Sequence, residues 1–110
     1  MSGPFDGEDD GVGVRGAPGR ETADLVREPR RFKVLLHNDD YTTMDFVVMI
    51  LRRVFHKDEN EAMRIMWAVH KQGLGVCGVF TAEVAETKVD TVHALAKAAG
   101  YPLRASLEEV

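Results

Sequence analysis

Residues 32–46 read FKVLLHNDDYTTMDF, and this stretch decides the fold. Its first part, residues 32–37, is a short apolar run that predicts a β-strand. The polar residues 38–42 predict a turn, because Asn and Asp side chains bond readily to nearby backbone N–H groups. Thr42 and Asp45 have the spacing of a capping box, so we expect a helix to begin there.

The rest of the chain alternates helix and strand signals. A second helix is expected from Asp58, with Glu61 in the capping position and Gly73 as its C-terminal stop. The remaining predicted elements are a strand at 76–80 that extends toward Val84, a helix at about 86–99 that stops at Gly100, and a strand at 103–107.

The order β-α-α-β-α-β predicts an α+β fold. We expect a single compact domain over residues 31–110, with a three-stranded antiparallel sheet and the helices packed on one face. Residues 1–30 differ from this domain, since they hold six of the ten glycines and three of the four prolines among charged residues. Such a segment buries too little apolar surface to offset the entropy of ordering it, so we expect a disordered N-terminal extension.

Composition and charge disfavour several classes of function. The formal net charge is -4, whereas nucleic-acid binders usually show a basic face. No apolar stretch approaches the roughly 20 residues needed to cross a bilayer, and acidic residues occupy the N-terminus where a signal peptide would be basic. The single cysteine, Cys77, suits a reducing compartment. We therefore expect a cytoplasmic, monomeric protein that binds neither nucleic acid nor membrane.

Two polar features could carry chemistry. One is Asn38-Asp39-Asp40 at the end of the first strand, and the other is His70 near the apolar face of the second helix. Taken separately, each is more often structural: a turn for the first and a half-buried histidine for the second. If the two adjoin, they form a polar rim around an apolar hollow, which suits a ligand with one positive charge on a hydrophobic body. An α-amino group beside a bulky side chain meets that description.

Two other functions remain open at this point. His70 with Asp39 and Asp40 could serve a small metal-dependent hydrolase. A purely structural interaction domain is the third reading, because fold alone does not decide function. The sequence shows no Gly-rich phosphate loop and no Cys or His cluster for zinc, so we expect no cofactor and no resident metal.

Three blocks of the sequence resemble the signature of the ClpS adaptor family. They are NDDYT at 38–42 with Met44 and Phe46-Val47, AVH at 68–70 with Gln72-Gly73, and CGVFTAEVAETK at 77–88. The resemblance covers about residues 31–107, and the blocks agree in order and spacing. It departs from the family pattern at Thr43, where many members have proline, and at Met49 and Trp67.

The resemblance implies an adaptor that binds bulky N-terminal residues, chiefly Leu, Phe, Tyr and Trp. It would deliver such substrates to the AAA+ unfoldase ClpA, which works with the peptidase ClpP in the bacterial N-end rule. Asn38, Asp39 and His70 match the positions that hold the α-amino group, Asp39 through water. The side-chain pocket positions are Asp40, Thr42, Met44, Val47, Met66, Val69 and Leu103. Met44 matches the position that excludes β-branched residues, and Glu83 and Lys88 match the unfoldase-docking surface.

Overall fold

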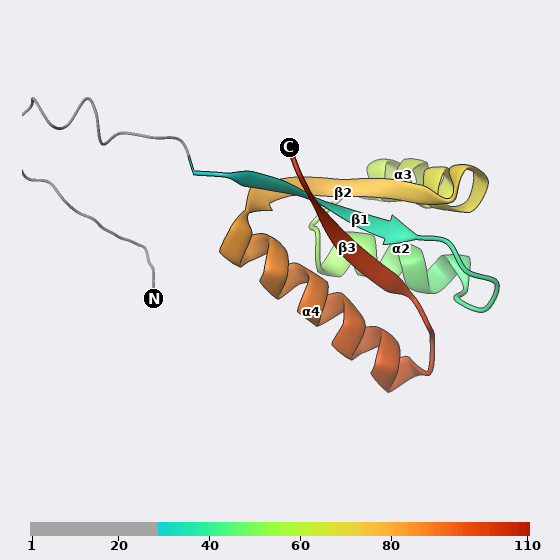
Figure 1. Ribbon diagram of the computed structural model, residues 1–110. Helices are drawn as coiled ribbons and strands as arrows, with labels where there is room; N and C mark the ends of the chain where they lie inside the picture. Colours follow the sequence, from blue (N-terminus) through green and yellow to red (C-terminus); the bar gives the residue numbers. More distant parts are fainter. Residues whose placement is uncertain (1–28) are drawn as a thin grey trace, which may run out of the picture.

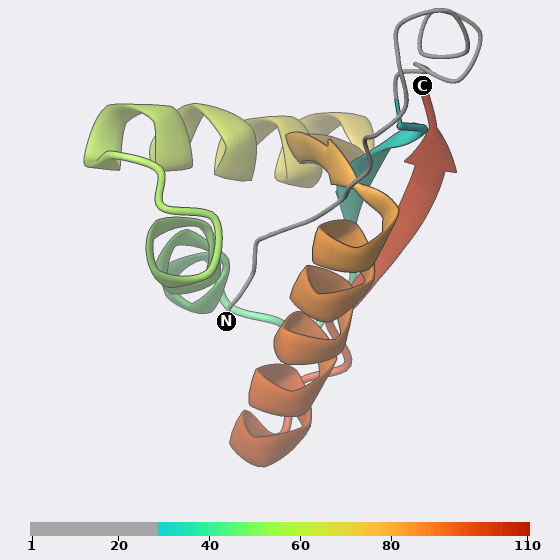
Figure 2. The ribbon, with the colours of Figure 1, turned by 90° about the vertical axis from the view of Figure 1, so that its left-hand side faces the viewer.

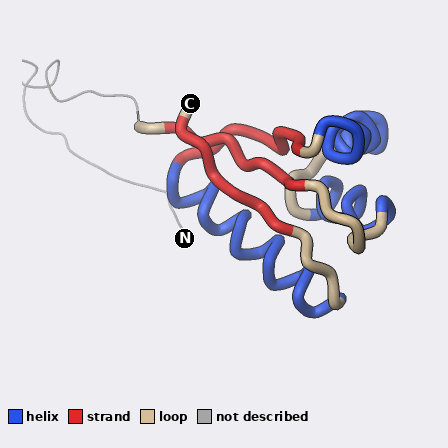
Figure 3. Tube along the Cα trace, turned by 45° about the vertical axis from the view of Figure 1, so that its right-hand side comes forward, coloured by secondary structure: helices blue, strands red, loops and turns tan. Residues whose placement is uncertain are grey.

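The sheet has three strands, and all of its pairings are antiparallel. The computed structural model describes residues 29–110, in which β1 (Arg31–His37) lies between β2 (Leu74–Thr81) and β3 (Arg104–Glu109) (Figure 3). The helices α2 (Met44–Arg53), α3 (Glu59–Gln72) and α4 (Ala82–Ala99) cover one face of the sheet (Figure 1, Figure 2). This arrangement confirms the predicted α+β fold and element order. The predicted disordered extension lies outside the described residues, except for residues 29 and 30.

The central strand supplies the middle of the core. Val34 and Leu36 are fully buried and belong to one cluster with residues from all three helices. Val34 pairs with Gly78 and Leu35 with Val76, so Cys77 lies in a β-bulge between these pairs. The Cys77 side chain is fully buried, and burial raises the pKa of its thiol to about 12. Within residues 29–110, no helix is long and apolar enough to cross a membrane.

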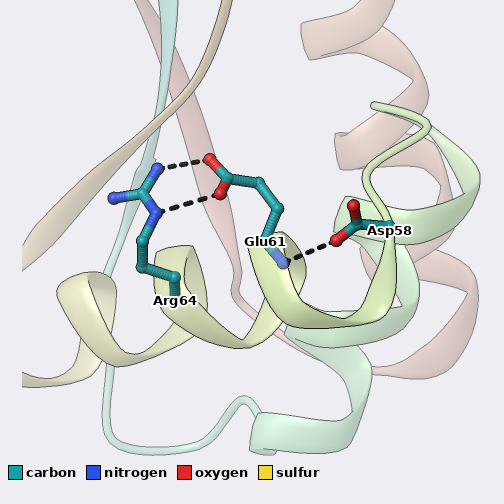
Figure 4. A network of polar contacts seen from close by, with 3 residues as sticks. All are labelled: Asp58, Glu61 and Arg64. Atoms are coloured by element: carbon teal, nitrogen blue, oxygen red, sulfur yellow. Dashed lines mark hydrogen bonds and ion pairs between the residues drawn. The ribbon is translucent and has the colours of Figure 1, made fainter.

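The second helix begins and ends where the sequence predicts. The Asp58 carboxylate caps α3 by accepting a 2.8 Å hydrogen bond from the backbone N–H of Glu61 (Figure 4). Glu61 also pairs with Arg64 one turn later on the exposed side of the helix. At the C-terminal end, Gly73 has a φ of 93°, a left-handed conformation that glycine adopts without a Cβ penalty.

The cap of α2 lies one residue later than predicted. The hydroxyl of Thr43, not Thr42, accepts the hydrogen bond from the N–H of Phe46, at 3.1 Å. Thr42 belongs to the preceding turn instead, where its backbone N–H and its hydroxyl both donate to the Asp39 carboxylate, each at 2.7 Å. The predicted capping box at Thr42 and Asp45 is therefore wrong by one position.

The last helix, α4, starts earlier than predicted. It begins at Ala82 directly after β2, so residues 82–84 are helical and not an extension of the strand. Thr81 occupies the N-cap position, but its side chain makes no capping hydrogen bond. The sequence also lacks a capping box here, because Val84 stands three residues after Thr81 where Glu or Gln would complete one, so the predicted start fell near Glu86.

β2 approaches α3 closely at Gly75. A Cβ built there would lie 2.9 Å from Cγ2 of Val69 and 3.1 Å from the carbonyl oxygen of Ile65. Such distances are below normal contact, so only glycine allows this spacing without displacement. The close approach holds the C-terminal half of α3 against the sheet beside the end of β1.

Candidate functional site

A backbone hydrogen bond joins the end of β1 to the end of α3. The N–H of Asn38 donates to the carbonyl oxygen of Gly73 at 2.9 Å, continuing the ladder in which His37 pairs with Leu74. His70 lies in the last turn of α3, three residues before Gly73. The turn after the first strand and the histidine of the second helix therefore lie next to one another, as the hypothesis of a shared site requires.

The carboxylate of Asp39 organises the turn. Oδ1 accepts the backbone N–H groups of Tyr41 and Thr42 at 2.8 and 2.7 Å, and Oδ2 accepts the Thr42 hydroxyl at 2.7 Å. Partial burial alone would raise the pKa of Asp39, but these hydrogen bonds outweigh it and hold the pKa below its ordinary value. The site therefore contains a fixed negative charge at neutral pH.

A cavity of about 510 Å³ opens between this turn, α2 and α3. Its lining residues are Asn38, Asp39, Asp40, Tyr41, Thr42, Thr43, Met44, Val47, Met66, Val69 and His70. The structure thus brings together all of the site residues taken from the resemblance, except Leu103, Glu83 and Lys88. Tyr41 and Thr43 were not predicted; their place within the turn was the only signal for them.

The cavity has an apolar floor and a polar rim. Val47, Met66 and Val69 are buried and form its base. Asn38 and His70 are exposed at its edge. Such a site buries a hydrophobic side chain while it offers an amide, an imidazole and a nearby carboxylate to a polar group at the entrance.

Leu103 lies in the hydrophobic core and does not line this cavity. Its side chain is 4% exposed and belongs to the same buried cluster as Val47, Met66 and Val69. Its predicted role as a pocket residue stays a prediction.

Glu83 and Lys88 have different surroundings. Glu83 is exposed in the first turn of α4 and lines a separate cavity of about 370 Å³. The Lys88 ammonium is half-buried: it donates a 2.7 Å hydrogen bond to the carbonyl of Val54, the C-cap of α2. The same ammonium lies 5.8 Å from the ring centre of Phe55 and 5.5 Å from that of Phe80. Lys88 is thus engaged within the fold.

The described residues offer no set of metal ligands for the alternative function, a metal-dependent hydrolase. Within the part of the chain that the structure describes, no group of three His, Cys, Asp or Glu side chains could hold a metal ion. The Asp39 carboxylate, which that alternative requires, is occupied by the N–H groups and the hydroxyl of its own turn.

Comparisons with known proteins agree with this geometry. The family model described as ATP-dependent Clp protease adaptor protein ClpS matches residues 27–106. The ATP-dependent Clp protease adapter protein ClpS of Nitratidesulfovibrio vulgaris is 66% identical over 96 residues, which cover 84% of this chain and 96% of that protein. The protein of the same name from Oleidesulfovibrio alaskensis is 62% identical over 96 residues, covering 83% of this chain and 92% of that protein.

A solved structure is also similar. The structure of Agrobacterium tumefaciens ClpS2 bound to L-phenylalaninamide matches with a TM-score of 0.73 at 38% identity, covering 76% of this chain and 100% of that chain. Together these similarities define an adaptor protein and not an enzyme. The chain belongs to the ClpS family of ATP-dependent Clp protease adaptors.

Proposed function

We propose that this adaptor binds proteins whose N-terminal residue is Leu, Phe, Tyr or Trp and delivers them to the unfoldase ClpA and the peptidase ClpP. The observation that carries the proposal is the apolar cavity whose rim holds Asn38 and His70 beside the charged Asp39. The ligand of the similar ClpS2 structure, L-phenylalaninamide, combines a free α-amino group with a bulky apolar side chain. It has the chemistry of a hydrophobic N-terminal residue.

The rim suits an α-ammonium group. With a pKa near 8, an α-amino group is mostly protonated at neutral pH and donates three hydrogen bonds. The Asn38 side-chain oxygen and an imidazole nitrogen of His70 are the direct acceptors in this proposal. Asp39 already accepts three hydrogen bonds of the roughly four that a carboxylate can take, so it acts through water and by its charge.

The expected affinity is moderate. Each charge-assisted hydrogen bond contributes roughly 1.5–3 kcal/mol, and burial of a Leu or Phe side chain contributes a similar amount. The entropy cost of association offsets much of this, which leaves micromolar binding. An adaptor that must release its cargo to a protease needs binding of this strength.

The partner surface is proposed at the first turns of α4. Glu83 is exposed there and available to the unfoldase. Because Lys88 is bound to the end of α2, we propose that it acts in docking by fixing the shape of this surface. We further propose that the protein acts as a monomer in the cytoplasm, consistent with a single, buried cysteine.

The test uses peptides that carry a dye at the C-terminus and differ only in the first residue. We expect Leu- and Phe-initiated peptides to bind, and N-acetylation to abolish binding because it removes the ammonium charge. Asn38→Ala and His70→Ala should each weaken binding about tenfold. Asn60→Ala, an exposed asparagine of α3 outside the cavity, is the matched control. Equal binding of acetylated and free peptides would refute the amino-group site. Capture of ClpA without any peptide binding would instead support the structural interaction domain.

A further inference from the structure

An exposed aromatic side chain lies directly beside the proposed amino-group site. Trp67 is 42% exposed, and its ring meets that of His70 edge-on, with centroids 5.8 Å apart and an interplanar angle of 71°. The Lys71 ammonium lies over the same indole at 5.4 Å from its centroid. Trp67 follows Met66, a residue of the cavity floor, on α3. The surface of the site therefore continues from the cavity over His70 to an ordered indole.

Trp67 presents a large apolar ring at the surface, and tryptophan is enriched at binding interfaces. Its neighbours also restrict it, because the histidine and the lysine each contact the ring. Ordering before binding reduces the entropy that a ligand contact must offset. Trp67 is thus well suited to contact an apolar group that passes over His70.

The geometry of a bound chain brings such a group within reach. If the first α-amino group is held at His70, the first Cα lies about 1.5 Å from that nitrogen, and the second Cα lies about 3.8 Å further on. The hydrogen bond from the amino group to the imidazole spans about 2.9 Å. The second residue is therefore within about 8 Å of the His70 ring, and a large side chain on it can contact the neighbouring indole.

We infer that Trp67 contacts the second residue of the bound chain and favours a large apolar or aromatic side chain there over glycine. This inference rests on the proposed function, since it requires the first residue to occupy the cavity. Lys71 adds to the preference at the second residue, because its positive charge beside Trp67 disfavours a lysine there. The adaptor would then recognise the first two residues of its substrate, and the first would contribute more to binding than the second.

The test compares three labelled peptides that begin Leu-Phe, Leu-Gly and Leu-Lys and are otherwise identical. The wild-type protein should bind Leu-Phe about threefold to tenfold more tightly than Leu-Gly. In Trp67→Ala the two affinities should become nearly equal, while binding of Leu-Gly should persist. Lys71→Ala should improve binding of Leu-Lys relative to Leu-Gly.

Tyr41→Ala is the matched control, since Tyr41 is an exposed aromatic residue that lines the cavity on the side of the turn. It should keep the ratio between Leu-Phe and Leu-Gly, whatever it does to overall affinity. A second readout is direct: Trp67 is the only tryptophan of the 110-residue chain, so its emission should change more with Leu-Phe than with Leu-Gly.

The outcomes separate the two proposals. If the wild-type protein binds Leu-initiated peptides but shows no preference at the second residue, the inference alone is overturned. The same holds if the preference survives in Trp67→Ala or is lost in Tyr41→Ala. If no peptide with a free N-terminus binds the wild-type protein, the proposed function fails and the inference fails with it.

Discussion

The backbone N–H of Asn38 lies 2.9 Å from the carbonyl oxygen of Gly73, and this hydrogen bond sets the distance between the two halves of the proposed binding site. Asn38 follows β1, whereas Gly73 ends the helix that carries His70. Gly73 can hold its carbonyl there because its backbone has a φ of 93°. The site thus depends on a left-handed residue that lies outside the cavity.

Gly73→Ala should reduce both stability and peptide binding. A Cβ at this position meets nothing within 4 Å, so the effect comes from the left-handed backbone alone. That conformation costs an L-residue about 1–2 kcal/mol. Gly100→Ala is the matched control, with a φ of 83° and the same open surroundings at the end of α4. Urea unfolding should show similar losses for both variants, but only Gly73→Ala should weaken peptide binding. Equal affinities of the two variants would contradict this role.

The Asp39 carboxylate should stabilise the protein in a pH-dependent way. Its pKa in the folded protein lies below the ordinary value of 3.8, so its contribution is present above that value and is lost as the pH falls through the folded pKa. At neutral pH, Asp39→Asn should cost about 1 kcal/mol in urea unfolding. The difference from wild type should shrink as the pH is lowered below 3.8.

Asp90→Asn is the control for this comparison. Asp90 is exposed on α4, and its side chain makes no hydrogen bond within residues 29–110. A stability difference between Asp39→Asn and wild type that stays constant with pH would show that the ionised carboxylate does not hold the turn.

Lys88→Met should destabilise the fold even without any partner present. The methionine keeps much of the apolar stem but removes the ammonium that donates to the Val54 carbonyl at the end of α2. Loss of a half-buried, charged hydrogen bond costs about 1.5–3 kcal/mol. Lys97→Met, in the exposed last turn of α4, should change stability by no more than about 0.5 kcal/mol. If both variants unfold like wild type, Lys88 acts only at the partner surface.

Met44→Ala should admit β-branched N-terminal residues. Met44 is the first residue of α2 and lines the cavity, where a rigid Ile or Val side chain would meet it near the Cβ. We expect the preference for Leu over Ile to fall about tenfold in this variant. Met63→Ala is the control, because this exposed methionine of α3 does not line the cavity. An unchanged preference in Met44→Ala would assign the selectivity to another residue.

The sequence predicted best where a local signal was complete. Asp58 with Glu61 and then Gly73 defined both ends of α3, because each end is fixed by its own side chain or backbone conformation. The prediction failed where two adjacent threonines could each cap the helix. Thr42 looked like a cap, but it donates its hydroxyl to Asp39, and Thr43 caps the helix instead.

Only part of the candidate site could be predicted from the sequence. The residue types of Asn38 and His70 suggested polar recognition, but their proximity depends on a long-range backbone bond that has no local signal. Lys88 shows the same limit. Its partner, Val54, lies 34 residues away, so the internal hydrogen bond became visible only in the folded chain.

The buried bulge residue Cys77 has a practical consequence. It is the only cysteine of the chain, it is shielded from solvent, and its raised pKa keeps the thiol protonated at neutral pH. Alkylating reagents attack thiolates, so they should leave the native protein unmodified. A second cysteine placed on an exposed helix position would then accept a single dye or cross-linker. Because Cys77 itself should not be labelled, no cysteine-free variant would be needed to follow cargo transfer by fluorescence.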